Sequence, residues 1–290
     1  MRPFRAALLA LGLADCAPAT VPARSVPLPV APRTTLTCEA SIAVPGDPNG
    51  LFWDAPRERL IIADSTHDRL LVWKAGETVS VLAELPEAAR SGLGQPVMDG
   101  EDVLVPRFGH GTAGSIARIA ADGSVTNLEG LAADRRRIGL SAADGRLFET
   151  YFVKTESGRA GALAEIRRDA TETPLASFAK PVAVCALGGA LYVSDQDAGA
   201  VFRCTTSAPS TCTRFAAVPA PDLLAAGPAG SLYTGGKDGD VRRVDAHGVV
   251  TTVAHGRTEV RGVAWDGSLR LFVARRTAND SGRVEVCTSP

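Results

Sequence analysis

Three aspartates in the second half of the sequence are candidates for chemistry. Asp195 and Asp197 follow a short apolar segment, and Asp222 follows a proline. Carboxylate oxygens are preferred ligands of Ca²⁺ and related divalent cations, and a desolvated carboxyl group can act as a general base near neutral pH. The three residues are therefore candidate ligand-binding residues, and Asp222 is the candidate metal ligand. The alternative is that they are solvated carboxylates in turns.

A set of arginines offers the opposite charge. Guanidinium groups bind sugar acids, phosphates and peptide carboxylates through paired hydrogen bonds. Some members of the set are expected to pair with acidic residues or to stay solvated instead. The candidates are Arg107, Arg136, Arg137, Arg261, Arg275 and Arg276.

Histidines and known motifs add little. His67 and His110 are candidates for metal binding or proton transfer, with a solvated loop position as the alternative, and the other two histidines lack metal-ligand spacing. The chain has no Gly-x-Ser-x-Gly, His-Glu-x-x-His, phosphate-loop or Gly-x-Gly-x-x-Gly motif. Its 31 Lys and Arg residues against 32 Asp and Glu residues leave no basic footprint for nucleic acid.

A repeat positions these residues. Six short apolar strands begin at Leu60, Val103, Leu147, Leu191, Leu232 and Leu271, with steps of 43, 44, 44, 41 and 39 residues. Each follows a strand of small apolar residues and a turn such as Asp-Gly or Gly-Gly, and two further strands follow it. A period of this length built from short strands predicts a six-bladed β-propeller with four-stranded antiparallel blades over residues 35–290. A two-sheet sandwich is the alternative fold.

The last blade is expected to be completed by the N-terminal strand. The sixth unit stops after three strands, and residues 35–44 precede the first unit as a strand without a blade. Residues 38–45 align without a gap with residues 212–219 of the fourth blade, including the cysteine and the Ala-Val-Pro ending. Since adjacent antiparallel strands bring these ends together, we predict the disulfides Cys38–Cys287 and Cys204–Cys212. Cys185 is expected to be a buried free thiol.

The order of the blades suggests where a ligand would bind. The loops that lead into the first strands, and those that join second to third strands, are expected to open on one face around the central channel. The residues that lead into the first strands are Asn49, Gln95, Ile138, Val182, Asp222 and Arg261, and the second strands end at Asp64, Arg107, Tyr151, Asp195, Gly236 and Arg275. Neighbouring Arg107 and Arg275 should neutralise Asp64. An acidic sector on blades four and five then faces a basic sector on blades six, two and three.

The repeat resembles the six-bladed propellers of the gluconolactonase and regucalcin family and the related NHL-repeat propellers. The resemblance extends over residues 35–290 as a pattern, and is best at Pro221-Asp222-Leu223-Leu224 and Leu191-Tyr192-Val193-Ser194-Asp195. It implies a divalent metal held by a Glu of the first blade, Asn residues in mid-chain and a Pro-Asp segment. Of these only Asp222 is present, because Pro48-Asn49-Gly50 lacks the Glu and Lys180-Pro181-Val182 lacks the Asn.

The first 34 residues predict export. Two arginines precede the apolar run of residues 6–14, and residues 13–16, Leu-Ala-Asp-Cys, resemble a bacterial lipobox, in which Cys16 would be acylated. An ordinary signal peptide is the alternative. Nine apolar residues are too few to cross a bilayer. Residues 1–16 are thus a signal peptide, and the proline-rich residues 17–34 a tether, which places the protein in the bacterial periplasm or on the cell surface.

Two functional hypotheses follow. The first is a monomeric, non-catalytic binding or scaffold module of the cell envelope, whose partner is a small anionic ligand or an envelope protein, with the membrane reached only through the lipid anchor. The second is a lactonase or other hydrolase with a divergent metal site, for which Ca²⁺ or another divalent cation is the candidate cofactor. The two differ in whether Asp195, Asp197 and Asp222 converge.

Overall fold

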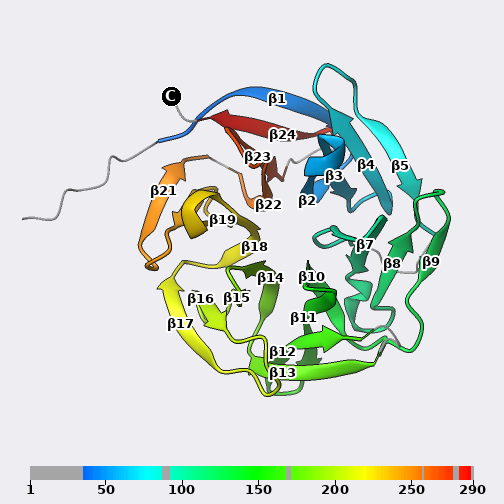
Figure 1. Ribbon diagram of the computed structural model, residues 1–290, viewed down its shortest axis with the longest axis vertical. Helices are drawn as coiled ribbons and strands as arrows, with labels where there is room; N and C mark the ends of the chain where they lie inside the picture. Colours follow the sequence, from blue (N-terminus) through cyan, green and yellow to red (C-terminus); the bar gives the residue numbers. More distant parts are fainter. Residues whose placement is uncertain (1–34, 87–91, 168–170, 257, 277–280, 289–290) are drawn as a thin grey trace, which may run out of the picture. The chain divides into compact units, whose positions relative to one another are not determined.

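A computed structural model of the chain describes residues 35–86, 92–167, 171–256, 258–276 and 281–288. The predicted signal peptide, tether and Cys16 lie outside these residues. The described chain folds into six four-stranded antiparallel sheets arranged as a ring around a central channel (Figure 1). The predicted propeller is confirmed, and the sandwich alternative is wrong. No helix in the described ranges is long and apolar enough to cross a membrane.

Blades one to three follow the sequence order. Blade one contains β2 (Pro48–Asp54), β3 (Arg59–Asp64), β4 (Arg69–Lys74) and β5 (Ser80–Glu84). Blade two contains β6 (Val97–Asp99), β7 (Asp102–Arg107), β8 (Ser115–Ile119) and β9 (Val125–Asn127). Blade three contains β10 (Arg136–Ala143), β11 (Arg146–Thr155), β12 (Gly158–Ile166) and β13 (Glu172–Phe178). Short 3₁₀ turns lie at Ala55–Arg57, Gly109–Gly111 and Pro228–Gly230.

Blades four and five have the same order, and blade six is split. Blade four contains β14 (Pro181–Leu187), β15 (Ala190–Asp195), β16 (Ala200–Cys204) and β17 (Cys212–Ala217). Blade five contains β18 (Pro221–Ala226), β19 (Leu232–Gly236), β20 (Val241–Val244) and β21 (Val250–Ala254). Blade six contains β22 (Val260–Trp265), β23 (Arg270–Arg275), β24 (Ser281–Thr288) and, as its outer strand, β1 (Thr37–Pro45).

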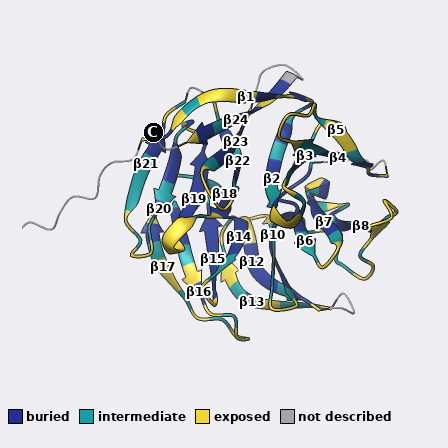
Figure 2. Ribbon diagram, turned by 45° about the horizontal axis from the view of Figure 1, so that its top comes forward, coloured by how far each residue is buried: buried dark blue, intermediate teal, exposed yellow. Residues whose placement is uncertain are grey.

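The second strands are apolar on both faces because each lies inside a blade that neighbouring blades cover. Every residue of β15 is buried, whereas the outer strand β1 exposes most of its residues (Figure 2). This explains why the repeat appears in the sequence as apolar runs rather than as alternating polar and apolar residues.

Turns and close contacts set the blade geometry. Asp144 and Gly145 both have positive φ, 52° and 69°, in the hairpin between β10 and β11, as the Asp-Gly pair predicts. At the channel, a Cβ atom on Gly94 would lie 1.9 Å from the carbonyl oxygen of Ile138. Blades two and three can approach this closely only because Gly94 has no side chain.

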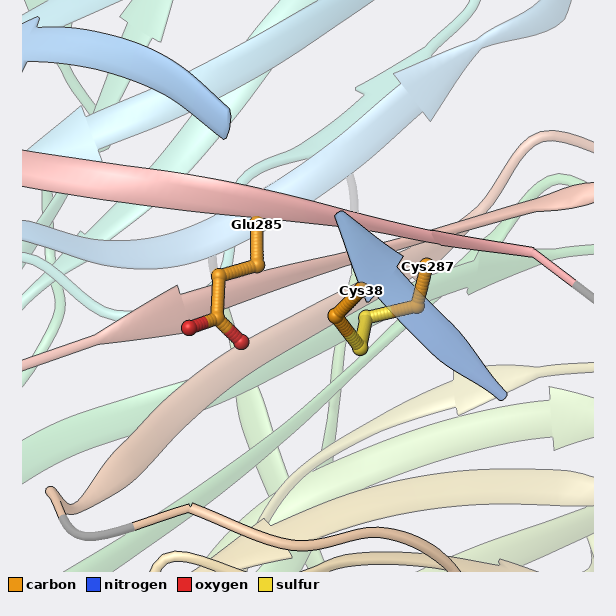
Figure 3. Close-up of side chains that lie close together, drawn as sticks. All are labelled: Cys38, Glu285 and Cys287. Carbon is orange, nitrogen blue, oxygen red and sulfur yellow. A yellow bond between two sulfur atoms is a disulfide. The ribbon is translucent and has the colours of Figure 1, made fainter. Parts of the chain in front are cut away.

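Both predicted disulfides are present. Cys38 is bonded to Cys287 and Cys204 to Cys212, while Cys185 is free and buried. The first bond joins β1 to β24 and fastens the ring where its two ends meet (Figure 3). Disulfides persist in oxidising compartments, which agrees with the predicted export.

Candidate functional site

The ring opens at one face into a cavity of about 550 Å³, which we call the mouth. It is built by the loops that lead into the first strands and those that join the second strands to the third. The residues predicted from the sequence that line it are Asn49, His110, Arg136, Ile138, Val182, Asp222 and Arg261. The mouth also contains Ser65, Phe108, Phe152, Lys154, Arg159, Lys180, Gln196, Lys237 and Glu259.

Asp222 is the main carboxylate of the mouth. It lies where β18 and β19 change register between Pro221 and Leu224. Its carbonyl oxygen accepts hydrogen bonds from Ser194 Oγ at 2.9 Å and from Thr234 Oγ1 at 3.3 Å, which fix the backbone at this irregularity. Burial, together with the negative charge of Glu259, raises the pKa of Asp222 to about 7, although the positive charge of Arg261 opposes the shift. Asp222 can therefore exchange a proton near neutral pH.

Basic side chains surround this carboxylate. Lys154, Arg159, Lys180, Lys237, Arg136 and Arg261 line the mouth against the two acids Asp222 and Glu259. Two of these cations pair with acidic side chains: Arg159 Nη1 lies 2.7 Å from Asp197, and Arg261 Nη1 lies 2.9 Å from Asp47. The remaining positive excess suits an anionic ligand.

One wall of the mouth is aromatic. The guanidinium of Arg136 lies 5.5 Å from the ring centre of Phe108 and 5.8 Å from that of Phe152. His110 packs edge-on against Phe108, with 4.8 Å between ring centres. The mouth therefore combines a positive surface with one apolar wall, as small-molecule sites commonly do.

Asp195 and Asp197 do not join Asp222 at the mouth. Asp195 is 1% exposed, and its carboxylate accepts hydrogen bonds from four backbone amides, those of Ala179, Lys180, Asp197 and Ala198. These hydrogen bonds link the segment before β14 to the loop that follows β15. Asp197 is partly exposed and pairs with Arg159. The acidic sector expected from the ring order therefore reduces to Asp222 within the mouth, where Glu259, which was not predicted, is the other acid.

Asp64 is neutralised, as expected, but by residues of its own blade. Arg69 Nε and His67 Nδ1 each lie 2.9 Å from Asp64 Oδ2, and the amide of Asp47 donates to Oδ1 at 3.0 Å. Hydrogen bonds from these groups lower the pKa of Asp64 despite its burial. His67 is thus part of the structural hydrogen-bond cluster around Asp64.

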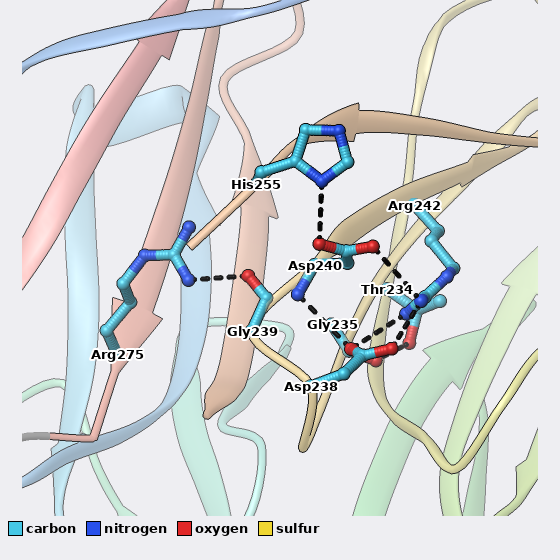
Figure 4. Close-up of polar contacts among 8 residues, drawn as sticks. All are labelled: Thr234, Gly235, Asp238, Gly239, Asp240, Arg242, His255 and Arg275. Carbon is cyan, nitrogen blue, oxygen red and sulfur yellow. Dashed lines mark hydrogen bonds and ion pairs between the residues drawn. The ribbon is translucent and has the colours of Figure 1, made fainter. Parts of the chain in front are cut away.

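Several predicted arginines are buried in the wall of the ring rather than exposed at the mouth. Arg107 pairs with Asp68 at 2.9 Å, and Arg275 binds Glu285 at 2.6 Å and the carbonyl oxygen of Gly239 at 2.7 Å (Figure 4). Arg137 is fully buried against Glu149. Their long side chains end at acids or carbonyl groups inside the ring wall, which leaves them no access to a ligand in the mouth.

Two other candidates also lie away from the cavity. Arg276 is 59% exposed and pairs with Glu259 at 3.4 Å, yet it does not line the mouth. Gln95 is buried beneath the mouth, where its Nε2 donates to the carbonyl oxygen of Leu224 at 2.9 Å. It lines a separate cavity farther along the channel.

Comparison with known proteins identifies the fold. No family model and no curated protein matches the sequence. Among solved structures, a gluconolactonase of Xanthomonas campestris has a TM-score of 0.69 at 18% identity, covering 91% of this chain and 99% of its own. The chain has the fold of the gluconolactonase propellers. The luciferin-regenerating enzyme is similar at TM-score 0.67 and 13% identity, covering 86% of this chain and 95% of its own.

A third similar structure belongs to another kind of enzyme. The virginiamycin B lyase of Staphylococcus aureus has a TM-score of 0.61 at 14% identity, covering 87% of this chain and 99% of its own. At such identities the likeness concerns the fold alone. Fold alone does not determine function, so the residues of the mouth must indicate the chemistry of this gluconolactonase-like propeller.

The mouth does not fit the divalent cation that the resemblance implies. The residues that lead into blades one, three, four and five are Asn49, Ile138, Val182 and Asp222, and all four line the cavity. Ile138 and Val182 have no ligand atom, and the amide nitrogen of Asn49 donates to the carbonyl oxygen of Leu93. Arg261 and Lys180 supply positive charge to Asp222 instead. A hard cation needs several oxygen ligands, and this donor set does not provide them.

One other group of side chains resembles a metal site. In the described part of the chain, the single set of three His, Cys, Asp or Glu side chains whose ligand atoms lie within 4.8 Å of one another is Cys38, Glu285 and Cys287. The two sulfurs are bonded to each other (Figure 3). Because a disulfide has no thiolate to offer a metal, this group is structural.

Most of the basic residues of the mouth were not predicted from the sequence. Five lining residues each follow by one position the predicted end of a second strand: Ser65, Phe108, Phe152, Gln196 and Lys237. Side chains alternate between the faces of a strand, so a shift of one residue exchanges a buried position for one that faces the cavity. Applying that shift to the repeat would have found Lys237 and Gln196.

Proposed function

We propose that the protein is a hydrolase of small anionic esters, with lactones as the first candidates, and that Asp222 is its general base. The observation that carries the proposal is a carboxyl group with a pKa of about 7 inside a cavity of about 550 Å³ whose charged side chains are mainly basic. A general base is most effective when its pKa lies near the working pH. The similar structures whose names denote enzymes support a hydrolase over a non-catalytic scaffold.

The chemistry needs one water molecule and no group absent from the chain. The Asp222 carboxylate takes a proton from water while the water oxygen attacks the ester carbonyl. The bond between the carbonyl carbon and the ester oxygen then breaks, and the proton passes to the departing alkoxide. A lactone opens in this way to a hydroxy acid.

Charged neighbours of Asp222 complete the site. Lys180 and Arg261 both act on Asp222 electrostatically, so we assign to them the stabilisation of the oxyanion that forms on the carbonyl oxygen. Fixed positive charges in a poorly hydrated site are effective in this role. The more exposed Lys154 and Lys237 would hold the anionic group of the substrate.

A hydrolysis assay with a matched control tests the proposal. Purified protein is given neutral lactones and carboxylate-bearing lactones in the presence of EDTA, and acid release is followed at several pH values. We expect turnover of the carboxylate-bearing lactones, with kcat/KM rising as the pH increases to about 7 and then levelling. Asp222→Asn should reduce kcat by roughly 100-fold or more. Asp122→Asn, in an exposed turn of blade two, should not.

Other outcomes would redirect the assignment. Full activity in Asp222→Asn, or loss of activity on chelation, would contradict the proposed base and its metal-free chemistry. Tight binding of the same anions with no turnover of any ester would support the other hypothesis, a non-catalytic binding module.

The proposal includes export to an oxidising compartment. The two disulfides support this location, as do Arg2, Arg5 and the apolar run of residues 6–14. Mass spectrometry of the protein from its native host should find a mature chain that begins at an acylated Cys16. An intact Met1 would contradict export, and an unmodified Cys16 thiol would contradict lipidation.

A further inference from the structure

A second cavity lies farther along the central channel. It has a volume of about 230 Å³ and is lined by residues of the first strands of all six blades. Phe52, Trp53 and Trp265 contribute aromatic surface, and Cys185 contributes its thiol. The lining contains no charged side chain. The cavity thus differs in chemistry from the basic mouth, with which it shares no lining residue.

Gln95 separates the two cavities. Its Nε2 crosses the channel from blade two to donate to the carbonyl oxygen of Leu224 on blade five, at 2.9 Å, and its backbone amide donates to the carbonyl oxygen of Ile138 at 3.0 Å. Leu224 lies two residues after Asp222. Gln95 and Leu224 line the second cavity, whereas Gly94 and Asp222 line the mouth, so this pair lies between the two cavities.

The same side chain has an unused acceptor. Gln95 is 8% exposed, and its Oε1 accepts no hydrogen bond from the described part of the chain. The orientation of the amide is determined, because a carbonyl oxygen such as that of Leu224 must face the NH₂ group and not Oε1. A buried acceptor without a donor destabilises the folded protein. This acceptor belongs to a side chain that lines the second cavity.

The aromatic residues are held in fixed orientations. Trp53 stacks on Phe272 with 5.5 Å between ring centres, and Trp265 stacks on Tyr233 at 5.7 Å. They come from blades one and six, which are neighbours in the ring (Figure 1). Preorganised aromatic surfaces favour a flat, apolar guest. An apolar cavity of about 150 Å³ is sufficient for benzene, so a bicyclic ring fits the larger volume here.

We infer that this cavity is a binding site for a neutral, planar aromatic molecule that carries one N–H or O–H donor. The ring lies against Trp53 and Trp265, and the donor bonds to Gln95 Oε1. The site is independent of the proposed hydrolase chemistry, since no residue of the mouth takes part. Failure of one assignment therefore leaves the other standing.

Matched probes test the donor requirement. Indole and 1-methylindole have nearly the same shape, but only indole has an N–H group. Isothermal titration should show indole binding roughly tenfold or more tightly than 1-methylindole, because the methyl compound leaves the buried acceptor unpaired. In Gln95→Met, which retains the length of the side chain without its acceptor, the two affinities should become equal.

A second variant tests the location. Ala226 is exposed and lines the cavity, so Ala226→Trp should fill the cavity and abolish binding of both probes without disturbing Gln95. Ala246→Trp, at an exposed turn elsewhere on blade five, is the control and should bind like the parent. In a Cys16→Ser background, bound indole should also slow modification of Cys185 by methyl methanethiosulfonate.

Three results would overturn the inference. They are equal affinity of the parent for indole and 1-methylindole, unchanged indole binding in Ala226→Trp, and no binding of indole up to its solubility limit. The last of these would mean that the channel holds water only.

Discussion

Cys38 is bonded to Cys287, a residue 249 positions away in the sequence. The bond lies between the outer strand β1 and the strand β24 of the same blade, so it joins the two ends of the propeller chain (Figure 3). The other disulfide, Cys204–Cys212, spans only 8 positions within blade four. The two bonds are alike in local geometry but differ in the length of chain that they constrain.

Loss of the long disulfide should therefore be the more damaging. In the chain-entropy model, a loop of this length contributes about 5.5 kcal/mol and the short one about 2.5 kcal/mol, as upper values. We expect Cys38→Ser to lower the melting temperature more than Cys212→Ser does, and also to release β1 from the sheet edge. Differential scanning calorimetry of both variants, with peptide mapping under non-reducing conditions, provides the measurement. Equal losses would show that the ring is closed by strand pairing alone.

The raised pKa of Asp222 has a consequence for stability. In the folded protein this carboxyl group keeps its proton up to a pH of about 7, whereas in the unfolded chain it releases the proton near pH 4. The free energy of unfolding should therefore fall as the pH rises from 4 to 7. Asn at this position imitates the protonated form and avoids the loss, so Asp222→Asn should be more stable at pH 8 by on the order of 1–3 kcal/mol.

Urea unfolding at pH 4, 6 and 8 measures this difference. The curves of Asp222→Asn and of the parent should nearly coincide at pH 4 and separate as the pH rises. A constant difference across the range would mean that Asp222 titrates in the folded protein as it does in the unfolded chain.

The fold could be predicted because its signals are local and repeated. The apolar second strands recur in every blade and the Asp-Gly or Gly-Gly turns in four of the six, and the matching positions of Cys38 and Cys212 revealed the split sixth blade. These features depend on neighbouring residues and on a period, both of which a single sequence contains. The closure of the ring followed from the same alignment.

The mouth was only partly predictable because the ring order places a backbone position but does not orient its side chain. Arg107 and Arg275 end their second strands as expected, yet both are 3% exposed and point into the wall. Lys237 and Gln196, one position beyond the strand ends, reach the cavity. Asp222 could be predicted from its entry position in the repeat and from the resemblance at Pro221-Asp222-Leu223-Leu224, and in the structure it lies at the register shift between Pro221 and Leu224.

Arg137 should be the most important single charge for stability. It is fully buried, and its Nη1 lies 2.6 and 2.7 Å from the two oxygens of Glu149, while Nη2 donates to the carbonyl oxygen of Ala132 at 2.8 Å. Burial and the adjacent Glu172 raise the pKa of Glu149, which is the member of the acid pair that retains a proton. Arg137→Met would leave these acids buried without their cation, at a cost of about 3–5 kcal/mol.

The control for this substitution is Arg118→Met. Arg118 pairs with Asp102 at 3.3 Å but is 41% exposed, and such a pair contributes about 1 kcal/mol or less. In chemical denaturation at pH 7, the decrease in the free energy of unfolding should therefore be several-fold larger for Arg137→Met than for Arg118→Met. Similar losses would show that the buried cluster relaxes or hydrates when its arginine is removed.

Lys154 and Lys237 should determine substrate charge preference without taking part in the chemistry. Both are exposed at the rim of the mouth, and within the described residues neither forms an ion pair. We expect Lys154→Gln combined with Lys237→Gln to raise KM for a carboxylate-bearing lactone by roughly tenfold, since each exposed charge contact is worth about 1 kcal/mol or less. The value of kcat, and the kinetics with a neutral lactone, should stay near those of the parent.

Added salt should also raise the KM of the parent, because it screens the rim charges. Lys74→Gln, on an exposed strand end of blade one, is the control. A fall in kcat with KM unchanged would instead place one of the two rim lysines beside the reacting carbonyl.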